Sequence, residues 1–350
     1  MISNHQEQHS LLRRSPGLPR PKIVAYALTA LILTSCSLAT TTPPVSRDFG
    51  VQQHVTTSTE PVVITTTTIS SEPTPPNSLP SSAGVLITPS GVVVALLGEN
   101  SGDFLIRTPC GVETTIDEGI PVSDVDVVID PGHGGAPDPG AVGANGLTEE
   151  RINLRVSGMV QQILEERGIR SILTRTGDYT TTIGVRAALA DQSGADLMVS
   201  IHHNAPTANL GSRPGTEVFV QSTSADSRRL GGLLYESVVD ALDDFDVVWS
   251  RAPDAGVLEV LNTRGTDAYG MIRNPATVSV LAELAYIANR PEAELFTTDE
   301  YVSVAAGAVA DAVERYLDSD DPGSGFVAEA RVFTPSRGIS GSVCQDPNLG

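Results

Sequence analysis

Residues 125–317 alternate between short apolar runs and longer segments with helical periodicity, and this alternation limits the fold more than any other feature. The apolar runs are rich in β-branched residues, as buried strands are. After Glu149, Val156 and Val160 lie on one helical stripe, and Gly168 ends the segment. Strands are predicted at 125–130, 171–173, 197–201, 216–220, 257–261 and 278–281, and helices at 149–167, 182–192, 227–242 and 300–317. This pattern predicts an α/β domain with a mainly parallel twisted sheet and helices on both faces.

The segments that flank this domain differ from it in composition. Residues 36–83 are rich in Thr, Ser and Pro and hold few charges, which predicts a disordered tether. Residues 84–120 contain strand-like runs separated by Gly-containing turns, which predicts a small β-hairpin element. Residues 318–350 form a tail in which 330–344 has a similar texture, so we expect the tail to pair with the β element.

The first 35 residues have the character of an export signal. Four basic residues precede an apolar run, Ile23–Leu33, that is too short to span a bilayer comfortably. The run ends in Leu33-Thr34-Ser35-Cys36, which resembles the lipobox of bacterial lipoproteins. The resemblance implies cleavage before Cys36, lipidation of its thiol and an extracytoplasmic protein anchored to the cell membrane. The alternative is an ordinary secretory signal and a secreted protein.

The cysteine count agrees with export. The chain has three cysteines, so Cys110 and Cys344 remain if Cys36 carries lipid. An even remainder in an exported chain predicts a disulfide, which here would join the two ends of the folded region. The alternative is a pair of unpaired buried thiols.

The formal net charge of −20 excludes some partners. An acidic chain is a poor ligand for nucleic acid and for anionic surfaces, so we expect no nucleic-acid partner. Any membrane attachment must then come from lipid, and stable attachment needs more than one acyl chain. We expect a monomer and predict no particular protein regulator.

Two histidines and one glutamate are candidates for a metal site. His133 follows the first strand in the loop Asp-Pro-Gly-His-Gly-Gly, Glu149 begins the next helix, and His202 ends a later strand. In a parallel sheet these positions converge at the carboxyl edge, where ligands gather. Two imidazoles and a carboxylate are the ligand set of a catalytic zinc site.

Each of these residues also has a simpler interpretation. His133 alone would be an ordinary turn histidine, and Glu149 alone would be an acid favoured by the helix dipole. Glu150 is the neighbouring alternative ligand. His202 and His203 cannot both face one metal in a regular strand, because adjacent side chains point to opposite faces. His203 would then support a ligand, contact substrate or be exposed.

Glu283 is the candidate for the general base. It lies at the end of a strongly apolar predicted strand, within Leu281-Ala282-Glu283-Leu284. An unpaired buried carboxylate is costly there. A carboxylate that faces water in a metal site avoids this cost, whereas a structural glutamate would need a salt bridge. Glu217 and Glu259, on other predicted strands, are weaker candidates.

Several motifs together resemble one enzyme family. They occur in the family's order at 130–135, 138–141, 146–149, 173–178, 200–205, 215–218 and 281–289, with Arg186 between them. In this order they resemble the zinc-dependent N-acetylmuramoyl-L-alanine amidases of the AmiC/CwlV type, over about residues 125–317. Any one motif would be weak, but their common order is specific.

The resemblance implies that His133, Glu149 and His202 hold zinc and that Glu283 is the catalytic residue. The reaction implied is hydrolysis of the amide between the lactyl group of N-acetylmuramic acid and L-alanine in peptidoglycan. Glu283 would take a proton from the attacking water and return it to the leaving amine. The candidate substrate contacts are His203, Asn204 and Arg175.

Departures from the family pattern are modest. His203 stands where a small residue is common, Asp191 replaces an asparagine, and Ala285-Tyr286 replaces Gly-Phe. Residues 205–280 show no extra amphipathic helix of the kind that plugs some members, so we expect a site that is open without an activator.

The alternative function is a catalytically weak peptidoglycan-binding lipoprotein. Absence of a His-Glu-x-x-His helix and of a Gly-x-Ser-x-Gly elbow argues against other common hydrolases.

Overall fold

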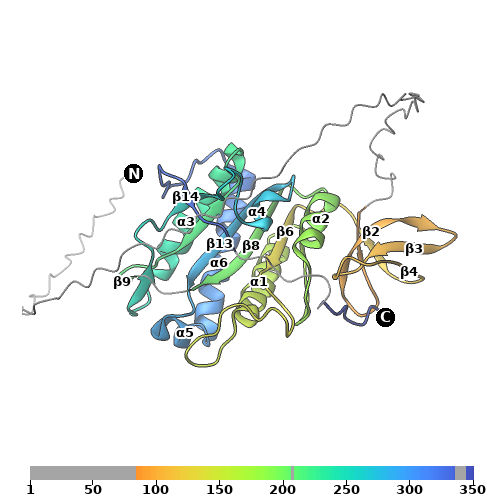
Figure 1. Cartoon of the computed structure of the whole chain (residues 1–350), viewed down its shortest axis with the longest axis horizontal. Helices are drawn as coiled ribbons and strands as arrows, with labels where there is room; N and C mark the ends of the chain where they lie inside the picture. Colours follow the sequence, from red (N-terminus) through yellow and green to blue (C-terminus); the bar gives the residue numbers. More distant parts are fainter. Residues whose placement is uncertain (1–83, 206–208, 336–343) are drawn as a thin grey trace, which may run out of the picture. The chain divides into compact units, whose positions relative to one another are not determined.

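The computed structural model describes residues 84–205, 209–335 and 344–350. In these residues the chain forms a large mixed sheet with helices on both faces and a separate antiparallel sheet that precedes it in sequence (Figure 1). This confirms the predicted α/β class. The predicted signal segment, Cys36 and the tether at 36–83 lie outside the described residues. None of the described helices is both long enough and apolar enough to cross a membrane.

The main sheet has the strand order β14-β12-β10-β13-β8-β6-β7. Its strands are β6 (Val127–Pro131), β7 (Ser171–Leu173), β8 (Leu197–Asn204), β10 (Glu217–Val220), β12 (Val257–Leu261), β13 (Val278–Tyr286) and β14 (Arg331–Val332). Neighbouring strands are parallel except β10 and β13, which are antiparallel. Because β6, β8 and β13 are mutually parallel, their carboxyl ends lie at one edge of the sheet. Two short strands, β9 (Asn209–Gly211) and β11 (Trp249–Arg251), pair separately.

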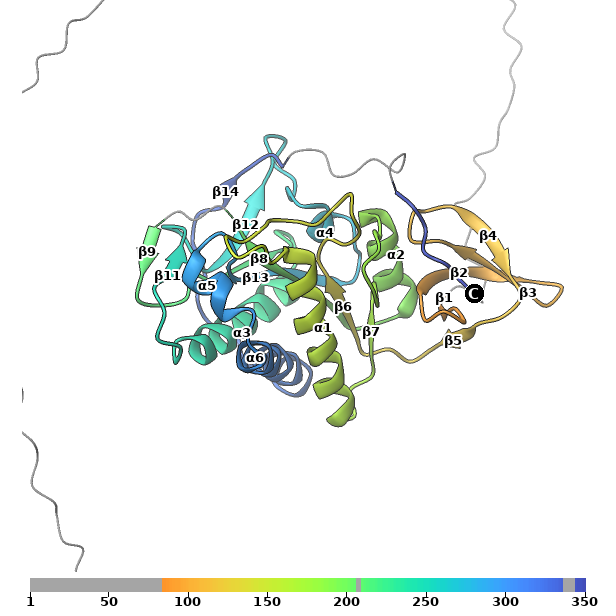
Figure 2. The same cartoon turned by 90° about the horizontal axis from the view of Figure 1, so that it is seen from below.

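Helices cover both faces of the main sheet (Figure 2). One layer consists of α1 (Glu149–Glu166), α3 (Ala225–Leu242) and α6 (Asp299–Asp318), with α6 in contact with the other two. The opposite layer contains α2 (Ile183–Ser193) and α4 (Gly270–Arg273), and α5 (Arg290–Leu295) follows β13. The helix starts and ends predicted from sequence agree closely with the bounds of α1, α2, α3 and α6, whereas the short helices α4 and α5 were not predicted.

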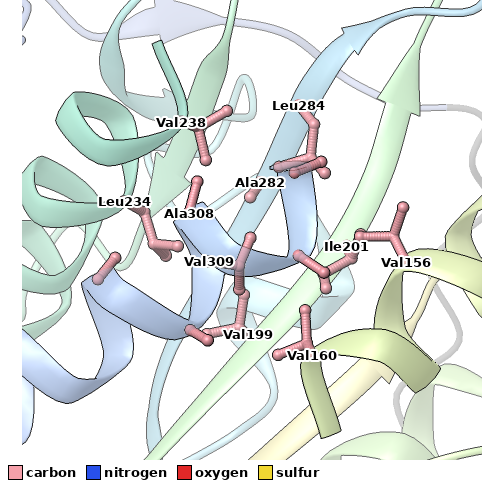
Figure 3. Packing of buried hydrophobic residues seen from close by; sticks show 14 of the residues in the cluster. Val156, Val160, Val199, Ile201, Leu234, Val238, Ala282, Leu284, Ala308 and Val309 are labelled. Atoms are coloured by element: carbon pink, nitrogen blue, oxygen red, sulfur yellow. The ribbon is translucent and has the colours of Figure 1, made fainter. Parts of the chain in front are cut away.

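The core forms because strand side chains alternate between the two faces. Val199 and Ile201 of β8 point toward the α1 and α6 layer, where Val156, Val160 and Val309 pack near them (Figure 3). All five side chains are buried. Burial of an aliphatic side chain of this size stabilises the fold by about 1.5–3 kcal/mol. The same alternation decides which polar residues at the strand ends reach the site.

The segment at 84–120 is more than a hairpin. Its antiparallel sheet has the order β4-β3-β2-β1-β5 within the described residues. The strands are β1 (Gly84–Ile87), β2 (Val93–Asn100), β3 (Asp103–Arg107), β4 (Glu113–Ile116) and β5 (Ile120–Val122). Val85, Val93 and Ala95 pack against Val185 and Leu189 of α2. The small sheet therefore shares a hydrophobic cluster with α2 and the main sheet.

The C-terminal tail divides its contacts between the two sheets. Arg331–Val332 pairs with β12 as strand β14 of the main sheet, so this part of the tail does not contribute to the expected pairing of the tail with the small β element. By contrast, Cys344 is joined to Cys110 by a disulfide. Next to this bridge, Asp346 accepts a hydrogen bond from the Thr108 hydroxyl at 2.8 Å. The residues from 344 onward thus contact the small sheet.

Candidate metal centre

His133, Glu149 and His202 meet at the carboxyl edge of the main sheet. Each offers a ligand atom, and these atoms all lie within 4.8 Å of one another. Nε2 of His133 lies 3.2 Å from Oε1 of Glu149, and Nδ1 of His202 lies 2.9 Å from the same oxygen. Glu150, the alternative ligand, does not belong to this cluster. The structure therefore brings together the three residues that the sequence predicted as ligands.

Glycines allow the ligands to approach so closely. A Cβ on Gly132 would lie 2.2 Å from Nε2 of His202. At Gly140, which has φ +67°, a Cβ would lie 2.7 Å from both the Glu149 carboxylate and the His133 ring. Because no other residue lacks a Cβ, the loop after β6 needs glycine at both positions.

Two buried arginines hold the loop that carries His133. Arg175 donates to the carbonyl oxygens of Pro131 at 2.9 Å and Gly132 at 3.1 Å. Arg186 donates to the carbonyl oxygens of Pro131 at 2.7 Å and His133 at 2.5 Å. Arg175 is fully buried, so we assign it to holding this loop instead of to the substrate contact predicted from sequence.

Asp138 orients the imidazole of His133. Its Oδ1 lies 2.7 Å from Nδ1 of His133, the ring nitrogen that faces away from Glu149. Burial alone would lower the pKa of His133, but hydrogen bonds with Asp138 and Glu149 outweigh burial and raise this pKa to about 10. A carboxylate behind a ligand imidazole fixes the ring and its tautomer. Sequence reasoning placed Asp138 in a family motif but gave it no role.

His203 points away from the cluster, into the α1 and α6 layer. Its Nδ1 lies 2.7 Å from Oδ1 of Asn153, and its Nε2 lies 2.8 Å from the Tyr301 hydroxyl. Burial lowers the pKa of His203 to about 3, so the ring is neutral. Asn153 in turn contacts Glu149 at 3.4 Å. The ring is fully buried with both nitrogens engaged, which agrees with the first of the three roles considered for His203, support of a ligand.

Glu283 lies between two polar neighbours in the sheet. It is in register with His202 on β8 and with Glu217 on β10. Its Oε2 is buried and has no hydrogen-bond partner among the described residues. Burial and the nearby charges of Glu149 and Glu217 raise the pKa of Glu283 well above its usual range. From the sequence we predicted that Glu283 is buried and that its position in the site offsets the energetic cost of burying the carboxylate.

Glu217 anchors a second polar network beside Glu283. Its Oε2 accepts hydrogen bonds from the Asn204 side chain at 2.6 Å and the Tyr286 hydroxyl at 2.9 Å. Its Oε1 accepts a hydrogen bond from Arg331, which also pairs with Asp254 at 2.6 Å. Asn204, predicted as a substrate contact, is thus engaged with Glu217. Nothing in the sequence indicated that Arg331 contacts this network, because Arg331 lies far along the chain from Glu217.

The described helices of residues 205–280 leave the ligand cluster uncovered. Helix α3 packs against α6 and against strands β10 and β13, on the face opposite α2. Helix α4 has only four residues and packs against α2 and β13. Neither has the position of a plug over His133 and His202.

The donor set fits a metal ion. Imidazoles and a carboxylate are ligands for divalent transition metals, which replace the proton on the ligand nitrogen, and His133 already has the supporting carboxylate that such ligands need. The buried, unpartnered Oε2 of Glu283 also fits, because a buried carboxylate oxygen without a protein donor is otherwise costly. This combination defines a metal-dependent hydrolytic centre at the edge of an α/β sheet.

Comparison with known proteins identifies the family. The family model "N-acetylmuramoyl-L-alanine amidase" (Amidase_3) matches residues 127–315, more than half of the chain. The uncharacterized protein YqiI of Bacillus subtilis is 37% identical over 215 residues, which cover 60% of this chain and 95% of that protein. N-acetylmuramoyl-L-alanine amidase AmiA of Escherichia coli is 29% identical over 219 residues, which cover 55% of this chain and 75% of that protein. The catalytic domain of CwlV from Bacillus (Paenibacillus) polymyxa var. colistinus aligns with TM-score 0.47 and 27% identity, over 56% of this chain and all of that domain.

The chain belongs to the N-acetylmuramoyl-L-alanine amidase family. It is a hydrolase that cleaves the amide between N-acetylmuramic acid and L-alanine in peptidoglycan. Its substrate is therefore the cell wall, outside the cytoplasm. The cluster of His133, Glu149 and His202 is the metal-binding triad of this hydrolase.

Proposed function

We propose that this enzyme is a zinc amidase in which His133, Glu149 and His202 hold the ion and Glu283 is the general base. The observation that carries the proposal is the three-residue ligand cluster, with its ligand atoms within 4.8 Å of one another. Two histidines and one carboxylate are the protein ligands of many catalytic zinc sites, which keep one position open. Glu283 is in register with one of the ligands, His202.

The chemistry follows from these side chains. When bound, zinc would polarise the amide carbonyl and lower the pKa of a water molecule at the site. Glu283 accepts a proton from the attacking water through its unpartnered Oε2. The water oxygen bonds to the lactyl carbonyl carbon, and the bond from that carbon to the L-alanine nitrogen breaks. Glu283 then returns the proton to the leaving amine.

The raised pKa of Glu283 suits its role as the base that accepts a proton from water and its later role as the acid that donates it to the leaving amine. Burial and the charges of Glu149 and Glu217 raise it, so the carboxyl binds a proton more readily than an exposed glutamate does. A base must hold the proton long enough to deliver it to the leaving group. Asp138 and Asn153 meanwhile keep His133 and Glu149 in place.

We also propose that the enzyme is attached to the membrane by lipid on Cys36 and acts as a monomer without an activator. Cys36 and the tether lie outside the described residues, so attachment rests on the lipobox-like sequence alone. A secreted form is the alternative. Activity without an activator is supported by the positions of α3 and α4, which leave the ligands uncovered.

Digestion of purified peptidoglycan tests the proposal. Wild type is compared with a chelator-treated sample, with Glu283→Gln, and with Glu259→Gln as a matched control on β12, a strand of the same sheet that does not pair with β13. We expect release of peptides that begin with L-alanine, loss of activity on chelation, and recovery with Zn²⁺. Glu283→Gln should lower kcat by roughly 10²–10⁴-fold while retaining bound zinc, and Glu259→Gln should resemble wild type.

Two results would contradict the proposal. Wild-type turnover by Glu283→Gln would exclude Glu283 as the base. Peptidoglycan binding by the zinc-loaded wild type without any released peptide would instead support a catalytically weak wall-binding lipoprotein.

A further inference from the structure

A pocket of about 870 Å³ opens beside the metal centre. Its walls are the start of α2 with the residues before it, the turn at 262–266, the start of α4, and Thr334 from the C-terminal segment. Asp138 also lines this pocket, and its carboxylate lies 2.7 Å from the His133 ring. Asp138 therefore borders both the pocket and the residue that it orients, His133.

The pocket carries positive charge in an acidic molecule. The chain has 42 acidic and 22 basic residues, yet both Arg264 and Arg273 line this pocket. Neither forms an ion pair with any residue that the structure describes. Asp138 is the acidic residue in the lining, and it is engaged with His133. The pocket thus has two cations available to an anionic ligand.

Arg273 is held in place without using its charge. Nη1 of Arg273 donates to the carbonyl oxygens of Asp267 at 2.8 Å and Ala268 at 2.9 Å. Its Nε and Nη2 have no acceptor in the described part of the chain. The backbone N–H of Arg264 donates to Oδ1 of Asn262 at 2.8 Å, which fixes the turn. The guanidinium of Arg273, held in this way, loses less conformational entropy on binding a carboxylate.

Two further groups in the pocket favour an anion. Ile183 and Gly184, in the first turn of α2, line the pocket, and this turn contains no acidic residue. The N–H groups at a helix start favour negative charge. In addition, Thr181 lines the pocket and is 3% exposed, and its hydroxyl has no hydrogen-bond partner among the described residues.

We propose that this pocket binds the stem peptide of the substrate and that Arg264 and Arg273 recognise a free carboxylate on it. This inference rests on the proposed function. Two arms leave the scissile amide: a neutral sugar chain and a peptide that carries carboxylates. Charge complementarity assigns the peptide arm to the pocket. The carboxylate meant is that of the second stem residue, which the experiment below compares in its free and amidated forms.

Paired synthetic substrates test this assignment. One is a muramyl tripeptide with a free carboxylate on the second residue, and the other carries an amide there. We expect wild type to prefer the free acid by about tenfold or more in kcat/KM, as a charge-assisted hydrogen bond supplies. Arg264→Gln with Arg273→Gln should reduce this preference toward one, mainly through a higher KM. Arg290→Gln, an exposed arginine outside the pocket, is the control and should keep the preference.

Binding to Glu283→Gln gives a second measurement that does not need turnover. Calorimetry with the free-acid and amidated stem tripeptides should show weaker binding of the amide, and the difference should vanish when both arginines are replaced. Equal kcat/KM for the two substrates in wild type, or an unchanged preference in the double variant, would overturn the inference. If wild type hydrolyses neither substrate, the proposed function fails, and the binding experiment still decides whether the pocket recognises the carboxylate.

Discussion

Asp130 is the residue on which the ligand loop depends most. It is fully buried at the end of β6 and pairs with Arg186 at 2.6 Å. The hydroxyl groups of Thr174 and Ser200 donate to its two oxygens at 2.5 and 2.6 Å. Arg186 in turn holds the His133 carbonyl. A chain of buried polar contacts therefore runs from the sheet to a metal ligand.

Replacing this carboxylate should be strongly destabilising. Asp130→Asn leaves Arg186 buried without its counterion, which costs about 3–5 kcal/mol in the free energy of unfolding. Asp126→Asn is the matched control, because Asp126 pairs with the exposed Arg170 and should lose about 1 kcal/mol or less. Urea unfolding measures both. Equal losses in the two variants would contradict the role of the buried pair.

The same residue predicts how stability responds to acid. Burial would raise the pKa of Asp130, but the charge of Arg186 and the hydrogen bonds from Ser200 and Thr174 outweigh burial and lower it. Its ionised form therefore stabilises the fold above about pH 4, and this contribution is lost as pH falls through the lowered pKa. The difference between wild type and Asp130→Asn in unfolding free energy should shrink from about pH 5 to about pH 3.

At the scale of elements, strand β14 contributes an arginine that pairs with a buried carboxylate of strand β10. Arg331 reaches Glu217, which is 1% exposed, and the register places Glu217 next to Glu283. Without Arg331, the buried Glu217 would lose its ion pair while it lies in register with a second glutamate, Glu283. The two-residue strand is therefore held by ion pairs as well as by its backbone hydrogen bonds.

Removing this arginine should affect both stability and the site. Arg331→Gln leaves Glu217 buried and unpaired, with an expected loss of about 3–5 kcal/mol. Arg331→Lys should recover only part of it, because Arg331 contacts two carboxylates at once. Arg228→Gln, which removes a part-exposed pair with Glu259, is the control. Thermal unfolding compares the three, and a loss below about 1 kcal/mol in Arg331→Gln would contradict the assignment.

Elements were predictable where local periodicity defines them. The apolar stripe of α1 and the β-branched runs of β6 and β8 have periods that can be read from sequence. Sheet-edge reasoning then placed His133, Glu149 and His202 together, and strand alternation separated His202 from His203. Asp138, Arg331 and the pairing of β14 were not predictable, because their contacts join residues with no common period or spacing.

At the scale of the whole molecule, the disulfide closes almost the entire described chain. Cys110 and Cys344 are separated by 234 residues. Replacing both cysteines by serine should lower the free energy of unfolding by about 2–5 kcal/mol, because the unfolded chain gains conformational freedom. Denaturant unfolding of oxidised wild type, reduced wild type and the double variant measures this. If reduction leaves wild type as stable as before, the bridge does not have this role.

The C-terminal segment also limits how the enzyme can be divided. The part that matches the amidase family ends at residue 315, whereas Arg331 and Cys344 lie beyond it. A chain cut at the family boundary would keep every metal ligand and Glu283, yet leave Glu217 without its arginine and the small sheet without its bridge. In this protein, therefore, the segment that matches the family model is shorter than the folded unit that the structure describes. Transfer of the catalytic domain to another protein would have to carry both flanks with it.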